Sequence, residues 1–354
     1  MPDGRPFRLG FLLHLDRDLP PARSYREAIE LFVAAERLGY DSGWVIQRHF
    51  RQGREHVSAP LVLLAAIAEH TTRIRLGTGV LVLPLEDPLK VAEDAASLDE
   101  ISGGRLELGV GSGPFPGAWE AFGKDIDNRH ALFDESVARL HDVLAGRPVN
   151  ELGEVLHPPG DAVRTRLWQA TTSSPEHAEH AAVRAARAGD GLQLSRATAW
   201  QGGTITDAQH RQAGIVDAYR AAWRDADRPP RVQVSRAVYP HPDPDEARRL
   251  VAPGVRRWQS WSTTGGTRHT ETVEDYLRSD HALLGPSESL AAQLAADPAL
   301  RRATDLLVSF VPGVPDHDEH LRLLETTERE LAPRLGWSPA ANQARPAVSA
   351  ALSS

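Results

Sequence analysis

Two kinds of hydrophobic pattern alternate along this chain. Short apolar runs rich in β-branched residues, typical of buried strands, precede longer stretches in which apolar residues recur at helical spacing. The pattern is clearest between Arg73 and Gly123, where the strand-like RIRLGTGVLVL is followed by the helix-like DPLKVAEDAASLDEI and by a second strand, RLELGVG. Pro88 stands where a helix begins, and both strands end in glycine. A strand–helix–strand of this size predicts a right-handed parallel βαβ unit.

The same alternation runs from one end of the chain to the other. Eight strand-like segments alternate with helical ones, which predicts an α/β fold closed into a (β/α)8 TIM barrel. The expected strands are 7–13, 43–47, 74–83, 105–111, 167–170, 191–194, 232–238 and 305–311. The expected helices are 25–38, 60–69, 88–101, 130–145, 175–188, 208–224 and about 316–335.

Two stretches interrupt this alternation. Residues 150–164 form a polar, proline-bearing connection. Residues 254–284, which carry two tryptophans and a Gly-Gly pair, are a long insertion before the last βα unit, and loops of this length are commonly functional lids. We therefore expect one barrel domain over residues 1–337 with this insertion, and a flexible tail rich in Ala, Pro and Ser over residues 338–354.

Composition narrows the class of protein. The 354 residues carry 40 Lys and Arg against 48 Asp and Glu, and this net charge of −8 argues against a nucleic-acid or anionic-membrane partner. With no cysteine, the chain has no disulfide, thiolate metal site or cysteine nucleophile, and its histidines lack the spacing of a metal site. No leader pattern opens the sequence and no run approaches the roughly 20 apolar residues of a membrane helix. The expectation is a cytoplasmic protein.

The residues that could carry chemistry follow the predicted strands. Active sites of parallel sheets lie at the carboxyl ends of strands, and glycine there lets a flat ligand approach the backbone. Arg48 and His49 end the second strand. His49, with an ordinary pKa near 6.5, is the candidate proton donor or acceptor, whereas Arg48 stays charged and suits an anion. Backbone N–H groups and hydroxyls of Gly111, Ser112, Thr171 and Thr172 are candidates to bind phosphate.

Several segments resemble the bacterial luciferase-like flavin-dependent monooxygenases. They are AAERLGYDSGWVIQRHF (34–50), PLEDPLKVAEDAASLDEISGGRLELGVGSG (84–113), FGKDIDNRHAL (122–132), LWQATTSSPEHAEHAA (167–182) and TDLLVSFVPG (304–313). The resemblance covers roughly residues 7–336 and implies a flavin-binding (β/α)8 barrel. In the luciferases, histidine stands at the position of Arg48 and arginine at that of Ser112, so this chain departs from them at both places.

The resemblance also implies positions for a flavin. It places a non-proline cis peptide at Gly79–Val80, behind the flavin ring. Phe115 and Trp119 would cover the ring or pack in the core, and His14 would line the substrate side. After the sixth strand, Ser195 and Arg196 are further candidates for the phosphate, with a solvated loop as the alternative for Arg196.

The activity implied by the resemblance is oxygen insertion. Reduced FMN, supplied by a separate flavin reductase, would react with O2 to a flavin 4a-hydroperoxide that oxygenates a small organic substrate, and the protein would be a homodimer. Two alternatives stay open: a deazaflavin-dependent oxidoreductase that transfers hydride, and a non-catalytic flavin-binding partner subunit.

Overall fold

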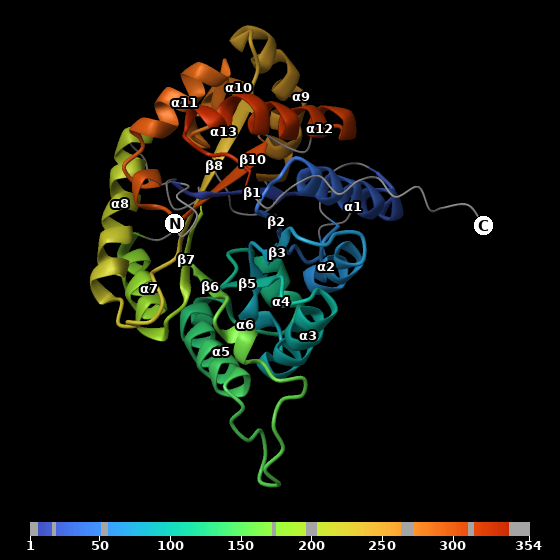
Figure 1. Cartoon of the computed structure of the whole chain (residues 1–354), viewed down its shortest axis with the longest axis vertical. Coiled ribbons are helices and arrows are strands. Elements are labelled where there is room, and N and C mark those ends of the chain that lie inside the picture. The colour runs from blue at the N-terminus through green and yellow to red at the C-terminus, as the bar shows by residue number, and fades with distance from the viewer. Residues whose placement is uncertain are drawn as a thin grey trace, which may run out of the picture.

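The chain folds into a closed barrel of parallel strands surrounded by helices (Figure 1). The computed structural model describes residues 6–15, 19–50, 56–171, 175–195, 204–262, 272–310 and 315–339. The barrel strands are β1 (Arg8–Leu13), β2 (Ser42–Val45), β3 (Arg75–Thr78), β5 (Leu106–Gly111), β6 (Leu167–Ala170), β7 (Gly191–Leu194), β8 (Val232–Pro240) and β10 (Asp305–Phe310). Strand β10 pairs in parallel with both β8 and β1, which closes the barrel and confirms the predicted fold class.

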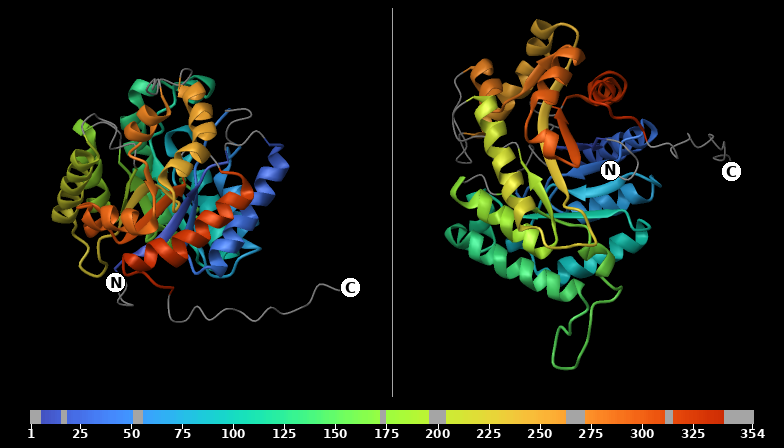
Figure 2. Two further views of the ribbon diagram at one scale, coloured as in Figure 1. Left: turned by 90° about the horizontal axis from the view of Figure 1, so that it is seen from above. Right: turned by 60° about the vertical axis from the view of Figure 1, so that its left-hand side comes forward.

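The helices between these strands form the outer layer, as both views in Figure 2 show. The principal ones are α1 (Pro21–Arg37), α2 (Pro60–Ala68), α3 (Pro88–Ile101), α5 (Arg129–Leu144), α7 (Pro175–Ala188), α8 (Ile205–Ala222), α11 (Ser287–Ala296) and α12 (His317–Thr326). Helix α3 shows why they begin where they do: the Asp87 side chain accepts a hydrogen bond from Leu89 N–H at 2.8 Å, and Pro88 occupies the first turn. None of the helices in the described ranges is long and apolar enough to cross a membrane.

Two predicted segments differ in detail. The strand expected over 74–83 is divided into β3 and a short β4 (Leu81–Val82), with the Gly79–Val80 peptide between them. The segment after β5 contains a short helix that the pattern did not indicate, α4 (Pro116–Ala121). Short connections of this kind are set by tertiary contacts, so hydrophobic periodicity carries little information about them.

The interval 254–284 is not a plain loop. It begins inside helix α9 (Pro244–Ser262), and it continues through α10 (Val273–Ser279) to β9 (Leu283–Gly285), which pairs in parallel with β8. The correction has a local cause, since Asp243 Oδ1 accepts from the N–H groups of Asp245 and Glu246 and starts α9 earlier in the chain. Residues 263–271 lie outside the described ranges. A lid over the pocket remains a prediction.

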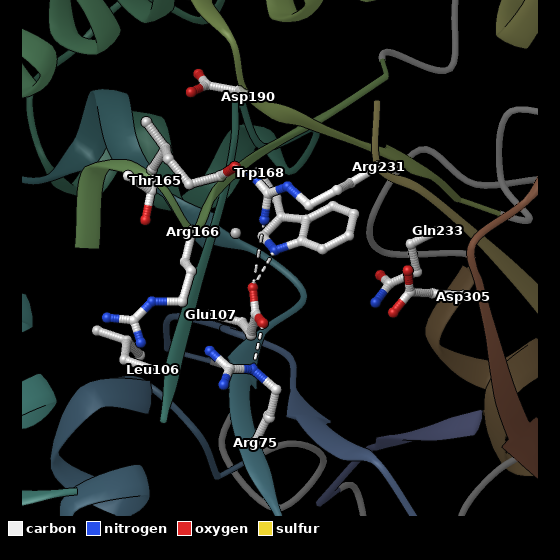
Figure 3. A network of polar contacts seen from close by, with 12 residues as sticks. Arg75, Leu106, Glu107, Thr165, Arg166, Trp168, Asp190, Arg231, Gln233 and Asp305 are labelled. Atoms are coloured by element: carbon white, nitrogen blue, oxygen red, sulfur yellow. Dashed lines mark hydrogen bonds and ion pairs between the residues drawn. The ribbon is translucent and has the colours of Figure 1, made fainter. Parts of the chain in front are cut away.

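Charged side chains fill the amino end of the barrel interior. Glu107 accepts a hydrogen bond from Trp168 Nε1 at 2.6 Å and is bonded to Arg75, while the nearest guanidinium nitrogen of Arg231 is 3.6 Å away (Figure 3). Burial alone would raise the pKa of Glu107, but the guanidiniums of Arg75, Arg8 and Arg231 outweigh it and lower the pKa to about 2. This end is therefore closed by a buried, ionised network.

A layer of tryptophan lies next to this network in the barrel. The rings of Trp44 and Trp168 meet edge to face with centroids 5.8 Å apart, and Leu307 packs with them. The rings need neighbouring glycines: a Cβ on Gly77 would lie 2.1 Å from Trp44, and one on Gly191 would lie 2.2 Å from Trp168. These rings fill this part of the barrel interior.

Candidate active site

The Gly79–Val80 peptide bond is cis, as the resemblance implies. It lies at the carboxyl end of β3, where Gly79 N–H donates to the Val45 carbonyl at 2.8 Å and Gln47 N–H donates to the Val80 carbonyl at 3.4 Å. Val45 at the end of β2 and Gln47 just after it thus form hydrogen bonds with this segment on both sides of the cis bond. The segment faces the end of the barrel at which active sites of this fold are built.

Glycines on β5 serve the packing of this segment. A Cβ on Gly111 would lie 2.6 Å from Val80 Cγ2, and a Cβ on Gly113, whose φ is +69°, would lie 2.4 Å from Val82 Cγ1. These two glycines therefore let the chain after β5 approach Val80 and Val82 closely. Gly79 differs, because a Cβ there would meet Leu12 Cδ1 at 3.0 Å and would occupy space in the barrel interior.

Arg48 contacts Phe115 across the mouth of the barrel. Its Cζ lies 4.4 Å from the centroid of the Phe115 ring, which is cation–π geometry, and its Nη1 donates to the Gln47 carbonyl at 3.1 Å. Arg48 N–H also donates to the Val57 carbonyl at 2.8 Å. The structure thus brings together two of the predicted residues, one from the end of β2 and one from the loop after β5.

His49 points to different neighbours. Its ring meets Phe122 edge to face with centroids 5.0 Å apart and lies 5.9 Å from the ring of Phe50. Burial lowers the pKa of His49, and the negative charge of Glu86 opposes this only in part, so the neutral imidazole prevails at neutral pH. Its Nε2 is buried and has no hydrogen-bond partner among the described residues.

The predicted phosphate-binding residues lie on adjoining strands. Thr171 is buried at the end of β6, where its Oγ1 donates to the Gln193 carbonyl at 3.3 Å. Ser112 is half-buried directly after Gly111, and a Cβ on Gly111 would lie 3.6 Å from Cβ of Ala170, the last residue of β6. The Ser195 carbonyl, after β7, accepts from Gln212 Nε2 at 3.0 Å.

Two further predicted residues fall outside the structure's described ranges: Thr172 and Arg196. Their expected contacts with phosphate stay predictions.

Trp119 is a core residue, which is the second of the two roles expected for it. It is 1% exposed, packs with Val82 and Leu85, and donates from Nε1 to the Gly113 carbonyl at 3.1 Å. Trp119 belongs to helix α4, and it is the buried residue of that helix.

His14 lines a small, partly open pocket between β1, α1 and α12. Ser24, His317 and His320 line the same cavity of about 20 Å³, which has room for one water molecule. His14 thus lies at the pocket that β1, α1 and α12 form.

Two residues that the sequence did not single out as functional join the site. The Gln47 side chain is fully buried and bonds to the Val82 N–H and to Glu86, and Glu86 acts electrostatically on His49. A sequence signal existed: Gln47 directly precedes Arg48, and Glu86 directly precedes the residue that caps α3, so both lie after strands at the carboxyl end.

The sequence profile of one family, described as luciferase-like monooxygenase, matches residues 9–305. The chain belongs to this family.

Individual relatives show how far the similarity extends. A 4-hydroxyprotoasukamycin monooxygenase from Streptomyces nodosus subsp. asukaensis is 38% identical over 126 residues, which cover 36% of this chain and 34% of the relative. An F420-dependent glucose-6-phosphate dehydrogenase from Gordonia bronchialis is 29% identical over 337 residues, covering 88% of this chain and 93% of the relative. The matches with the first three curated relatives cover only 34% to 56% of those proteins.

A solved structure has the same fold. The oxygenating constituent of 3,6-diketocamphane monooxygenase from Pseudomonas putida, in complex with FMN, superimposes with a TM-score of 0.73 at 20% identity, over 94% of this chain and 99% of that one. At this identity the likeness concerns the fold alone.

Proposed function

We propose that this protein is an FMN-dependent monooxygenase that uses reduced FMN and O2 to oxygenate a small organic substrate. One observation carries the proposal: directly after β3, at its carboxyl end, glycine at position 79 leaves free the space that a side chain would take. The 38% identity with a monooxygenase over 126 residues supports the choice of reaction.

The residues present fit a flavin. Glycine at position 79 leaves free the space in the barrel interior that a Cβ would take, which suits the face of a flat ring. We assign the ring to Gly79 and Val80, with Phe115 beside it, and the phosphate to Gly111, Ser112, Thr171, Thr172, Ser195 and Arg196. When bound, reduced FMN supplies the electrons that activate O2.

This chain's own side chains would then handle charge and protons. The guanidinium of Arg48 would stabilise negative charge that develops beside the ring. His49, whose pKa burial lowers, would accept or donate a proton through Nε2. Phe122 and Phe50 limit the access of water to this imidazole. A separate flavin reductase would supply the reduced cofactor, and a homodimer would be the assembly.

Anaerobic titration with reduced FMN, followed by oxygen admission, tests the proposal. We expect the protein to bind reduced FMN and to consume O2 faster than free reduced FMN in the presence of an accepted substrate. Arg48→Ala and His49→Gln should lower substrate-dependent oxygen consumption, whereas Arg147→Ala, a change at a side chain 70% exposed, should not. Binding of flavin without any turnover would instead indicate the non-catalytic partner subunit.

A second candidate is hydride transfer with the deazaflavin F420. One observation favours it: the F420-dependent relative aligns over 88% of this chain, far more than the monooxygenase relative does. Deazaflavin lacks the ring nitrogen that permits oxygen activation. Tight binding of F420 alone, with no oxygen uptake, would move the protein to this class and refute the FMN proposal.

A further inference from the structure

Both polar atoms of the Gln47 side-chain amide form hydrogen bonds within the protein. Its Nε2 donates to the Ser58 carbonyl at 3.0 Å and to Glu86 Oε1 at 2.9 Å, and its Oε1 accepts from the Val82 N–H at 2.6 Å. The partners fix the orientation of the amide, because Val82 N–H can only donate and the Ser58 carbonyl can only accept. Gln47 is 1% exposed; its bond to Val82 N–H is buried, and its bonds to the Ser58 carbonyl and to Glu86 are partly buried.

These bonds join three separate parts of the carboxyl rim. Val82 belongs to β4, directly after the Gly79–Val80 peptide, and Ser58 lies in the segment before α2. Glu86 comes between β4 and α3. The backbone N–H of Gln47 adds a fourth contact, to the Val80 carbonyl at 3.4 Å. One residue at the end of β2 therefore holds the segment 80–82 by its backbone and by its side chain.

We propose that Gln47 is a positioning residue of the flavin site, which sets the Val80–Val82 backbone for the flavin ring and holds Glu86 beside His49. The inference rests on the proposed flavin-binding function and adds a residue to it. Gln47 need not touch flavin or substrate, since it acts through Val80, Val82 and Glu86.

An amide is the group that the position requires. A carboxylate at residue 47 could still accept from Val82 N–H, but its second oxygen would face the Ser58 carbonyl and the Glu86 carboxylate, with no hydrogen to share. In the protonated form, a glutamic acid has one hydrogen, so it could restore the bond to Glu86 but not also the bond to the Ser58 carbonyl. The other charged or titratable groups at this place are Arg48, whose Nη1 lies 3.1 Å from the Gln47 carbonyl, and His49.

The test compares FMN binding by wild type, Gln47→Glu and Gln47→Met between pH 5.5 and 8.5, each expressed as a ratio to wild type at the same pH. Gln47→Met removes every polar bond of the side chain while keeping its length, so affinity should fall about tenfold at all pH values. Gln47→Glu should bind nearly as wild type at pH 5.5 and about tenfold more weakly at pH 8.5.

A double variant and a matched control make the result specific. Gln47→Glu combined with Glu86→Gln restores a donor opposite the new carboxylate, so its affinity at pH 8.5 should return to within about threefold of wild type. Gln293→Glu makes the same substitution at an exposed position of α11 and should leave binding unchanged. The urea midpoint of each variant is measured alongside.

Each outcome has a separate meaning. Wild-type affinity in both Gln47 variants at every pH would overturn this inference alone. So would a loss of affinity that follows a parallel loss of stability and that the double variant does not rescue, because a merely structural residue would behave in this way. Failure of the wild-type protein to bind FMN would refute the proposed function first, and the positioning role with it.

Discussion

The two ends of the barrel interior differ in the side chains that fill them. At the amino end, Glu107 is surrounded by three arginines and by Trp168, and its polar atoms are engaged with one another. At the carboxyl end, glycine replaces side chains at Gly79, and the buried Nε2 of His49 has no hydrogen-bond partner among the described residues. The first end is filled by ion pairs that stabilise the fold. The second leaves the space of a side chain free at Gly79, which suits a binding site.

Neutralising Glu107 should have the largest effect on stability. Glu107→Gln leaves Arg75, Arg8 and Arg231 without their shared carboxylate, and removing one partner of a buried ion pair costs about 3–5 kcal/mol. Urea unfolding measures the loss, and Glu100→Gln, at an exposed position of α3, is the control. The folded fraction should still bind FMN with wild-type affinity. Unchanged stability would mean that the charged network does not hold this end together.

Two alanine substitutions on one strand should separate the two ends. In Gly77→Ala the new Cβ would lie 2.1 Å from the Trp44 ring, and overpacking of this kind costs about 1–3 kcal/mol in urea unfolding. In Gly79→Ala the nearest atom is the movable Leu12 Cδ1 at 3.0 Å, so stability should change little. The methyl group would, however, occupy the proposed ring face and weaken FMN binding about tenfold or more. Equal effects of the two variants on both measurements would contradict the division.

Acid should remove the contribution of Glu107 to the stability of the fold. The pKa of Glu107 is lowered from 4.5 to about 2, so its contribution to stability is complete above pH 4.5 and is lost as the pH falls toward 2. At pH 3.5 this group alone should have lost about 1 kcal/mol. Urea midpoints between pH 6 and 3.5 should therefore fall more steeply for wild type than for Glu107→Gln. Parallel pH profiles would show that Glu107 titrates normally in the fold.

The smallest expected change concerns the protonation of His49. The charge of Glu86 raises the pKa of this imidazole against the larger effect of burial. Glu86→Gln removes that charge, so the pKa of His49 should fall further below its ordinary value, as followed by NMR titration of the ring. A rise or no change would show that Glu86 does not act on His49.

Hydrophobic periodicity predicted most of the barrel because each strand and helix repeats its own pattern. Helix 175–188 and strands 167–170 and 191–194 agree with α7, β6 and β7 to the residue. It could not predict the division between β3 and β4 or the inward turn of Trp119, because these depend on contacts between segments distant in sequence. The start of α9 at Pro244 depends instead on the local cap at Asp243, which hydrophobic periodicity does not detect.

The positions of site residues at strand ends could be predicted from the sequence, whereas their contacts with distant segments could not. Arg48 and Phe115 could be placed at strand ends, and the structure shows them in contact. The bonds of Gln47 to Val82 and Glu86 span 35 and 39 residues of sequence, and nothing in the local pattern reveals them. A charge network such as that around Glu107 is equally invisible, because its members come from separate strands.

A crystal structure of the protein with bound FMN tests the central claim most directly. The account predicts the flavin ring against Gly79 and Val80 at the carboxyl end, with its phosphate near Ser112 and Thr171. FMN bound elsewhere on the barrel, or its ring turned away from Gly79–Val80, would contradict the account.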